Sequence, residues 1–239
     1  MTDEEKFIES LYEEANENLK EIYKEQKVVR DELLQEIALI MLTYTIIDGV
    51  MSINKSDKDK ACKKLLSLIV VNYKNISKKE VNVLNNILES TVGKTFKFYN
   101  YNADLKDVRK IIDNNFKGKH FSKRVWNNEK NIANHLHKQI KNFVNGEVNV
   151  NQIKKDIEKT FNTSAYNAKR LVTTEVSRCQ NEAFISFCKE TGVKKIKRNE
   201  TLDSKTCEEC RSLHGKIFDL NKAPGIIHTM CRGFNEVYK

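Results

Sequence analysis

The feature that most constrains the fold of this chain is its scarcity of residues that break helices. Of 239 residues, one is proline and eight are glycine. The long stretches between them are rich in Leu, Ile, Lys, Glu and Asn. Because proline and glycine most often interrupt or end a helix, this composition favours helices joined by short connections. We therefore predict a mainly α-helical protein.

Apolar residues recur every three or four positions over much of the chain, the period of an amphipathic helix. In the centre, Ser122, Asn151 and Ser164 are residues that can cap a helix, and Gly146 stands where a helix would end. We expect Trp126 to anchor the buried stripe of the helix that starts at Ser122. The predicted helices cover residues 7–22, 33–50, 57–73, 78–98, 104–116, 122–146, 151–161 and 164–192.

The helical period disappears beyond Gly192, and two short runs, residues 193–197 and 216–218, are typical of strands around turns. This change of pattern predicts a small C-terminal α+β module. We expect three parts: a helical N-terminal region (1–115), a helical central region (116–192) and the C-terminal module (193–239).

Four metal-ligand residues stand in the C-terminal module as two close pairs. Cys207 and Cys210 are followed by seventeen residues and then by His228 and Cys231. Three thiolates and one imidazole form a closed tetrahedral set for zinc, which is the arrangement of a structural site rather than a catalytic one. A module near the lower size limit of roughly 40 residues usually needs a metal or another cross-link to stay folded. The binding of structural zinc supplies a free energy on the order of 10–16 kcal/mol. We therefore predict a zinc-stapled module.

Other uses of these residues stay open at this stage. A Cys-x-x-Cys pair can be a redox centre, but that use expects a strand followed by a helix. A disulfide is a further alternative. His214 stands near the first pair and competes with His228, although the pairing of His228 with Cys231 makes His228 the better candidate.

The sequence predicts neither a secretory signal nor a membrane span. Residues 1–36 contain many Asp and Glu residues, whereas a signal peptide has a basic start and an uncharged apolar core. The most apolar segment, residues 37–47, is far shorter than the roughly 20 residues needed to cross a bilayer, and we expect it to be a buried helix. Cys62, Cys179 and Cys188 stand singly, which fits a reducing compartment better than an extracellular disulfide framework.

Charge is distributed unevenly along the chain. Residues 1–60 hold eight Lys or Arg against fifteen Asp or Glu, a net charge of −7, so the remaining residues carry +16 to give the total of +9. Such a basic body suits nucleic acid or an acidic protein surface. A gene rich in lysine and asparagine codons would explain the same composition without any partner.

Several short segments, in the same order, resemble the phage minor head proteins, also called phage head-morphogenesis or Mu F-like proteins. The resemblance covers about half the chain, from near Phe116 to the end, and residues 1–115 match no motif. Family members commonly end in Cys-Arg-Cys, whereas here the last position is Gly233. The matching segments are 118–124 (GKHFSKR), 143–146 (FVNG), 173–178 (TTEVSR), 181–183 (NEA), 201–210 (TLDSKTCEEC), 213–216 (LHGK) and 224–232 (PGIIHTMCR).

This resemblance implies a virion component present in few copies. Such a protein would associate with the portal or the head interior, act in head assembly and in DNA packaging or delivery, and reside in host cytoplasm during assembly. Its expected partners are the portal protein and other head proteins, with phage DNA as a further candidate through the basic body, and no membrane or small-molecule substrate.

The sequence gives no positive reason to expect an enzyme. It has no glycine-rich phosphate loop, nucleophile elbow or His-Glu-x-x-His helix. Glu175 is expected to close a salt bridge with Arg178 at i+3, Asp203 to form a turn or a hydrogen bond near the metal, and His135 and His137 to be solvated. Some relatives carry a toxin or transferase domain after the zinc module, and we expect none here because the chain ends eight residues after Cys231.

Two alternative functions are compatible with parts of the sequence. A zinc-containing nucleic-acid-binding regulator is the first alternative, but it would need a recognition helix supported by the metal, and the sequence shows none after His228. A nuclease or transferase is the second.

Overall fold

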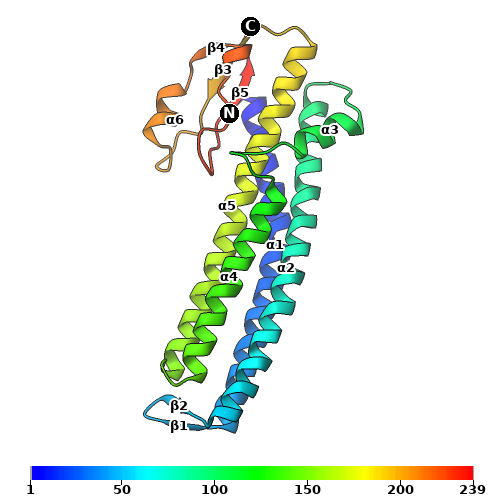
Figure 1. Ribbon diagram of the computed structural model, residues 1–239. Coiled ribbons are helices and arrows are strands. Elements are labelled where there is room, and N and C mark those ends of the chain that lie inside the picture. The colour runs from blue at the N-terminus through cyan, green and yellow to red at the C-terminus, as the bar shows by residue number, and fades with distance from the viewer. Residues whose placement is uncertain (1, 239) are drawn as a thin grey trace. The chain divides into compact units, whose positions relative to one another are not determined.

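The computed structural model describes residues 2–238 and is mainly helical, with strands concentrated in its C-terminal region, as predicted (Figure 1). The elements are α1 (Asp3–Thr43), β1 (Thr45–Ile47), β2 (Val50–Ser52), α2 (Lys55–Phe98), α3 (Leu105–Ile112), α4 (Phe121–Val144), α5 (Val150–Glu190), β3 (Lys195–Asn199), α6 (Glu208–Leu213), β4 (Ile217–Asp219), the 3-10 helix η1 (Leu220–Lys222) and β5 (Phe234–Val237).

Three of the helices are longer than the sequence pattern indicated. The breaks predicted at residues 23–32, 74–77 and 162–163 are wrong, because α1, α2 and α5 run through them without interruption. None of these stretches contains glycine or proline. Ser164, predicted to start a helix, is instead buried inside α5, where it donates to Glu129 Oε1 and accepts from Gln26 Nε2, both at 2.8 Å.

The ends of the central helices were predicted more closely. Helix α4 begins one residue before Ser122. It ends at Val144, two residues short of the predicted range, and Gly146 at φ +78° donates its N–H to Phe143 O at 3.0 Å. Helix α5 is capped by Asn149 rather than Asn151, because Asn149 Oδ1 accepts from the backbone N–H of residue 151.

Two further predictions about helices need correction. Trp126 does not anchor the stripe of α4: its side chain is 37% exposed, while the aliphatic residues of the stripe are buried. Helix α3 has the predicted start, with Asp104 Oδ1 accepting from Asp107 N at 2.8 Å, but it ends at Ile112 rather than Phe116.

A β-hairpin replaces the end of the helix predicted over residues 33–50. Helix α1 ends at Thr43, and β1 pairs antiparallel with β2 so that Ile47 faces Val50. The two residues between them, Asp48 and Gly49, both have positive φ, 49° and 78°. Asp-Gly is a preferred pair for a two-residue hairpin turn, and the flanking β-branched residues favour strands.

The described residues divide into two compact units. The helical unit comprises Lys20–Val81 and Ser122–Ala168, and the mixed unit comprises the described residues of Met1–Leu19, Asn82–Phe121 and Lys169–Lys239. Helices α1, α2 and α5 contribute to both units, since each crosses a boundary. The three-part division of the chain made from the sequence stays a prediction.

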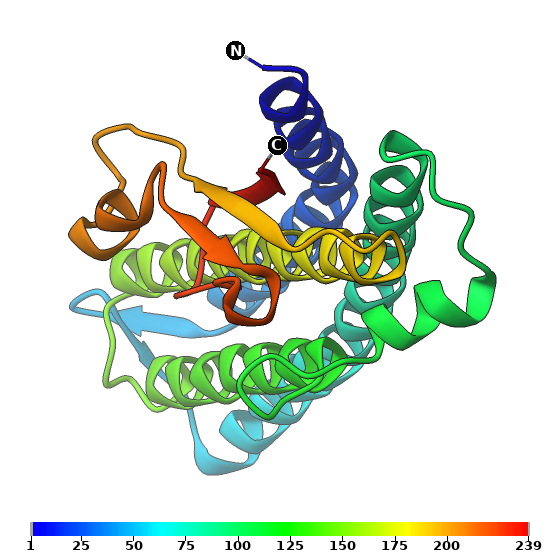
Figure 2. The same cartoon turned by 90° about the horizontal axis from the view of Figure 1, so that it is seen from above.

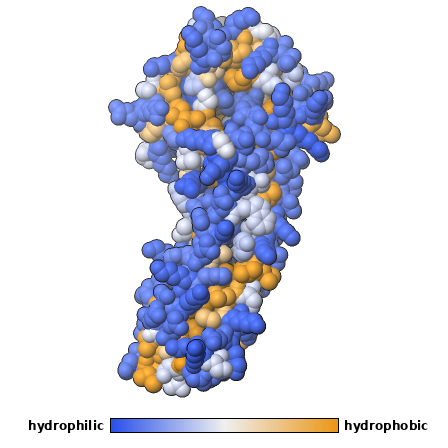
Figure 3. Space-filling view, viewed as in Figure 1, coloured by the Kyte–Doolittle hydropathy of each residue, from blue (hydrophilic) through white to orange (hydrophobic). Residues whose placement is uncertain are grey.

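The helical unit has an aliphatic core supplied by four helical segments that run side by side in Figures 1 and 2. Leu33, Leu65, Ile140 and Ile157, one from each of α1, α2, α4 and α5, are almost completely buried in it. The hairpin adds Met51 to this core. Near the hairpin, Leu42 and Ile47 are exposed, and the space-filling view shows hydrophobic patches on an otherwise mostly hydrophilic face (Figure 3).

The mixed unit packs a three-stranded antiparallel sheet, in the order β4-β3-β5, beside the C-terminal part of α5 (Figure 2). Phe184, Cys188 and Ile196 form a small buried cluster between α5 and the sheet. The residues predicted as strands correspond to β3 and β4, and β5 was not predicted. Within residues 2–238, every helix falls short of the length and apolar character that a bilayer crossing demands.

Candidate metal centre

The C-terminal module brings the four predicted ligands into two overlapping sets: Cys210 lies close to Cys207 and His228, and also close to Cys231. Cys207 Sγ lies 3.3 Å and Cys210 Sγ 3.1 Å from His228 Nε2, and Cys210 Sγ lies 3.9 Å from Cys231 Sγ. A tetrahedral zinc with bonds of about 2.3 Å to sulfur places neighbouring ligand atoms roughly 3.5–3.8 Å apart. The three printed distances are close to that spacing, and the residues of either set could hold a metal.

Local structure explains how the first pair is presented. Cys207 is the N-cap of α6, with extended backbone angles of φ −68° and ψ 163°. Its sulfur accepts a hydrogen bond from the backbone N–H of Cys210 at 3.4 Å. One short helical turn thus directs both sulfurs to the same side.

The imidazole of His228 is oriented by its own backbone. Its Nδ1 lies 2.8 Å from the carbonyl oxygen of Thr229, which leaves Nε2 facing the thiols. This is the usual arrangement for a histidine that binds metal through one nitrogen and donates a hydrogen bond through the other. His214 is engaged elsewhere, because its Nδ1 accepts from the backbone N–H of Glu200 at 3.1 Å.

The surroundings affect the thiols in opposite directions. The backbone N–H of residue 210 donates to Cys207 and lowers the pKa of that thiol. Burial raises the pKa of the Cys210 thiol, which is removed from water. The hydrogen bond to the Thr229 carbonyl raises the pKa of His228.

Neither alternative use of the cysteines has support in the geometry. All six cysteines are free thiols, and the 3.9 Å between the sulfurs of Cys210 and Cys231 is far from the roughly 2.0 Å of a disulfide. Cys207 follows turns and bends rather than a strand, unlike the first cysteine of a thioredoxin-like redox pair.

Two residues of the cluster were missed from the sequence. Glu200 forms a second potential ligand set with Cys210 and Cys231, in which all donor atoms lie within 4.8 Å of one another. Arg198 forms an ion pair with Glu200 at 2.6 Å. Both residues lie at the end of β3, where charged side chains more often face water, so the sequence carried no signal for their burial.

The cluster is attached to α5 through side chains of that helix. Thr174 Oγ1 accepts a hydrogen bond from the backbone N–H of Met230 at 3.0 Å. Met230 has a positive φ of 62° in the turn between His228 and Cys231. Asn235, which follows the last ligand, donates to Asn181 Oδ1 at 2.6 Å. Helix α5 therefore holds the second ligand pair in place.

The predicted structural roles of Glu175 and Asp203 are confirmed. Arg178 Nε donates to Glu175 Oε2 at 2.7 Å, and both side chains are almost fully buried. The guanidinium also donates to the carbonyl oxygens of Ile111 and Ile112 at the end of α3. Asp203 Oδ1 accepts from Lys205 N at 2.8 Å in a turn.

Among the described residues, Asp203, His135 and His137 belong to neither potential ligand set. A 2.6 Å hydrogen bond from Arg232 Nη2 lowers the pKa of Asp203 to about 2. His135 is exposed beside Gln139, as expected for a solvated residue. His137 is only half-buried, but its Nε2 is buried without a hydrogen-bond partner, so its solvation was only partly predicted.

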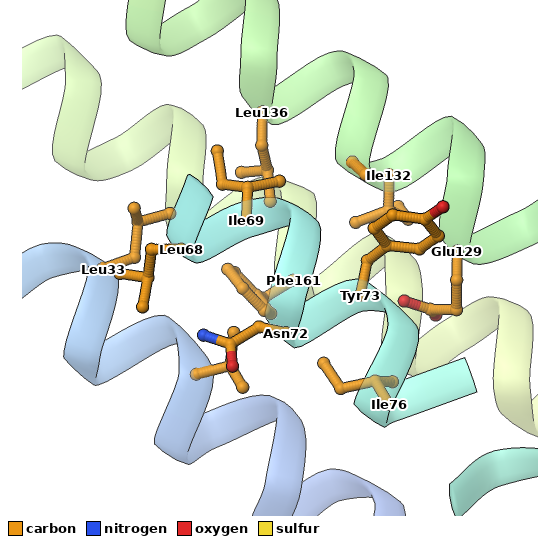
Figure 4. Close-up of a pocket in the computed structure, with 12 residues that line it drawn as sticks. Leu33, Leu68, Ile69, Asn72, Tyr73, Ile76, Glu129, Ile132, Leu136 and Phe161 are labelled. Atoms are coloured by element: carbon orange, nitrogen blue, oxygen red, sulfur yellow. The ribbon is translucent and has the colours of Figure 1, made fainter. Parts of the chain in front are cut away.

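A cavity in the helical unit is too small to be a ligand site. It has a volume of about 20 Å³ and lies among aliphatic and aromatic side chains, with Glu129 at its edge (Figure 4). A single water needs at least about 10–15 Å³, so this space suits one water-sized molecule.

The fold and the site together define a mainly helical protein whose C-terminal region gathers cysteine and histidine side chains that could hold a metal. Residues 130–233 match the family model described as Phage Mu protein F like protein. This match covers less than half of the chain and supports a Mu F-like phage head-morphogenesis protein. The matched segment runs from α4 to just beyond Cys231. Searches of curated proteins and of solved structures found no match.

Proposed function

We propose that this protein is a phage minor head protein, a structural part of the virion that acts in head morphogenesis and in DNA packaging or delivery. The observation that carries the proposal is the match of residues 130–233 to the Mu F-like family. Membership of the Mu F-like family would imply a place in the phage head and contacts with other head proteins. The portal is the partner we propose within that set, and assembly would take place in host cytoplasm.

We further propose that Cys207, Cys210, His228 and Cys231 bind one structural zinc ion. Three short distances support this set: 3.3 Å and 3.1 Å from His228 Nε2 to the sulfurs of Cys207 and Cys210, and 3.9 Å between the sulfurs of Cys210 and Cys231. Bound zinc would need Cys231 to move closer to Cys207 and His228 than it lies here. Bound zinc would cross-link the turn at the start of α6 to the turn that precedes β5. Because all four ligands come from the protein, no coordination position is left for a substrate.

An enzymatic role is not part of the proposal. The most reactive-looking carboxylates, Glu175 and Asp203, are engaged by Arg178 and Arg232. A regulator is also disfavoured, because α6, the helix that carries two of the ligands, has six residues and begins with two glutamates. A helix of that kind is short and repelled by DNA phosphates.

DNA is a candidate partner for the basic part of the chain, given the net charge of +9. Binding through lysines and arginines would weaken steeply as salt is raised. Titration of labelled duplex DNA at several salt concentrations would measure that slope.

The decisive test uses a phage that carries Cys207→Ser and Cys210→Ser in this gene. We expect few particles, or particles that lack this protein or fail to deliver DNA, because the module loses two ligands. Cys62→Ser is the matched control, since Cys62 lies on α2 in the other compact unit. Wild-type particle yield and infectivity for the double variant would contradict the proposal.

Two measurements on purified material complete the test. The protein should copurify with mature particles, and elemental analysis should find one zinc per chain. Incubation with DNA, RNA and nicotinamide dinucleotide should give no turnover. Product formation in any of these reactions would favour the enzyme alternative.

A further inference from the structure

A buried ion pair lies next to the candidate metal ligands Cys210 and Cys231. Arg198 is 0% exposed, and its Nε donates to Glu200 Oε1 at 2.6 Å. Removing two charges from water costs several kcal/mol for each ion, and their mutual attraction offsets this only when the remaining donors also find partners. The other contacts of the guanidinium therefore indicate what the pair does.

Those contacts lead to both ends of the loop that carries the second ligand pair. Arg198 Nη1 donates to the carbonyl oxygen of Pro224 at 3.4 Å, and Nη2 donates to Cys231 Sγ at 3.5 Å. The carboxylate of Glu200 lies within 4.8 Å of the sulfurs of Cys210 and Cys231. One guanidinium thus links β3 to the start and the end of the segment that contains His228.

The space around Gly233 independently supports a specific arrangement of this ion pair. A Cβ added at residue 233 would lie closer than 3.0 Å to Arg198 Nη2 and to both carboxylate oxygens of Glu200. Real Cβ atoms essentially never come that close to another atom. The ion pair therefore occupies the space that any other side chain at this position would need.

We propose that Arg198 and Glu200 are the positioning pair of the metal centre: Arg198 holds the Cys231 sulfur in place, Glu200 orients Arg198, and Gly233 leaves room for both. The inference rests on the proposed zinc site. Three thiolates around a divalent ion leave one net negative charge, and a guanidinium that donates to one sulfur offsets it. Partners that orient metal ligands typically change metal affinity 10–100-fold when they are lost.

The first test is Arg198→Lys in the full chain, with zinc affinity measured by competition against a chromophoric chelator. Lysine keeps the charge but lacks the planar fork that reaches three acceptors at once. We expect affinity to fall by about tenfold or more. Lys197→Gln is the matched control: Lys197 lies next in the same strand and makes a half-exposed ion pair with Glu236, and its loss should leave zinc affinity unchanged.

A cobalt-substituted protein gives a readout that a general loss of stability would not move. The thiolate-to-cobalt absorption reports how many sulfurs bind the ion. If Arg198 positions Cys231, this absorption should decrease in Arg198→Lys at saturating cobalt and remain unchanged in Lys197→Gln. An unaltered spectrum together with wild-type zinc affinity would overturn the inference.

A pair of glycine variants tests the same idea without changing a charge. Gly233→Ala forces the ion pair aside, whereas a Cβ at Gly225, in the same loop, meets only Asn181 Nδ2 at 3.7 Å. We expect weaker zinc binding in Gly233→Ala and none of this loss in Gly225→Ala. This comparison decides the matter if Arg198→Lys does not fold.

The outcomes separate the two proposals. A wild-type chain that binds no zinc would end both. A wild-type chain that binds zinc tightly, with Arg198→Lys and Gly233→Ala unchanged, would end the positioning role alone and leave the zinc site standing.

Discussion

Glu80 and Glu129 place two carboxyl groups inside the helical unit, each only 2% exposed. Desolvation, together with the charge of Glu129, raises the pKa of Glu80 to about 8. Desolvation also raises the pKa of Glu129, although the hydrogen bond from Ser164 opposes this. Near neutral pH the folded protein therefore keeps a proton on Glu80 that the unfolded chain releases.

We predict that the stability of the protein falls as the pH rises from about 5 to about 8. A raised pKa means that the folded state binds more protons than the unfolded state in this window, whose lower bound is the ordinary value near 4.5. The contribution is complete below that value and is lost as the pH passes through the folded pKa. Each unit of pKa difference corresponds to about 1.4 kcal/mol.

Glu80→Gln should flatten this pH dependence and raise stability at pH 8, because the buried side chain can no longer ionise. Urea unfolding at several pH values would measure it. A smaller slope should remain from Glu129. The control is Glu21→Gln, an exposed glutamate on α1, and an equal slope in wild type and Glu80→Gln would show that Glu80 is not the responsible group.

At the scale of single residues, contacts between positions close in sequence could be predicted. Burial that depends on distant parts of the chain could not. The bond between Glu175 and Arg178 could be predicted, because residues at i and i+3 of a helix are neighbours. The clustering of the ligands was indicated by two pairs of close spacing. The burial of Arg198 and Glu200 depends on a loop that is distant in sequence, and no local pattern reveals it.

At the scale of elements, the turn of the β1–β2 hairpin leads to a testable prediction. Gly49 has a positive φ of 78°, and a Cβ there would collide with Asn149 Nδ2. We expect Gly49→Ala to destabilise the protein by about 1–2 kcal/mol. Thermal or urea unfolding would measure this loss.

Gly93 is the matched control for this substitution. It lies within α2, and a Cβ there meets no atom within 4 Å. Alanine in place of a helical glycine should stabilise by about 0.5–1 kcal/mol. Opposite signs for the two variants are the expected result, and equal effects would count against a special role for the turn.

The elements themselves were predicted unevenly, for identifiable reasons. Helical character was clear from the apolar period, but breaks were placed at polar stretches that contain neither glycine nor proline, and the helices continue through them. The hairpin was missed because its apolar residues extend those of α1 without a gap. The Asp48–Gly49 pair was the available signal.

For the whole molecule, the proposed zinc site predicts that metal removal affects the two units unequally. Among the described residues, the buried aliphatic core of the helical unit extends as far as Phe161. The sheet of the mixed unit has a much smaller buried centre. We therefore expect a chelator to increase hydrogen exchange in β3, β4 and β5, while the core of the helical unit stays protected.

Mass-spectrometric hydrogen exchange of the zinc-loaded chain, before and after chelation, would check this prediction. The Cys207→Ser and Cys210→Ser double variant should show the chelated pattern from the outset and should not respond to chelator. Unchanged protection of the three strands after complete metal removal would rule out a stabilising ion.

The mixed unit has a consequence for biosynthesis. It joins the described residues of the first nineteen positions to residues 169–238, and Tyr12 of α1 bonds to Ser177 of α5. A ribosome makes the chain from the N-terminus, so the start of α1 can meet its neighbours in α2, such as Phe98 beside Phe7, long before Ser177 of α5 has been made. The helical unit, which is complete by Ala168, could form its core earlier during translation.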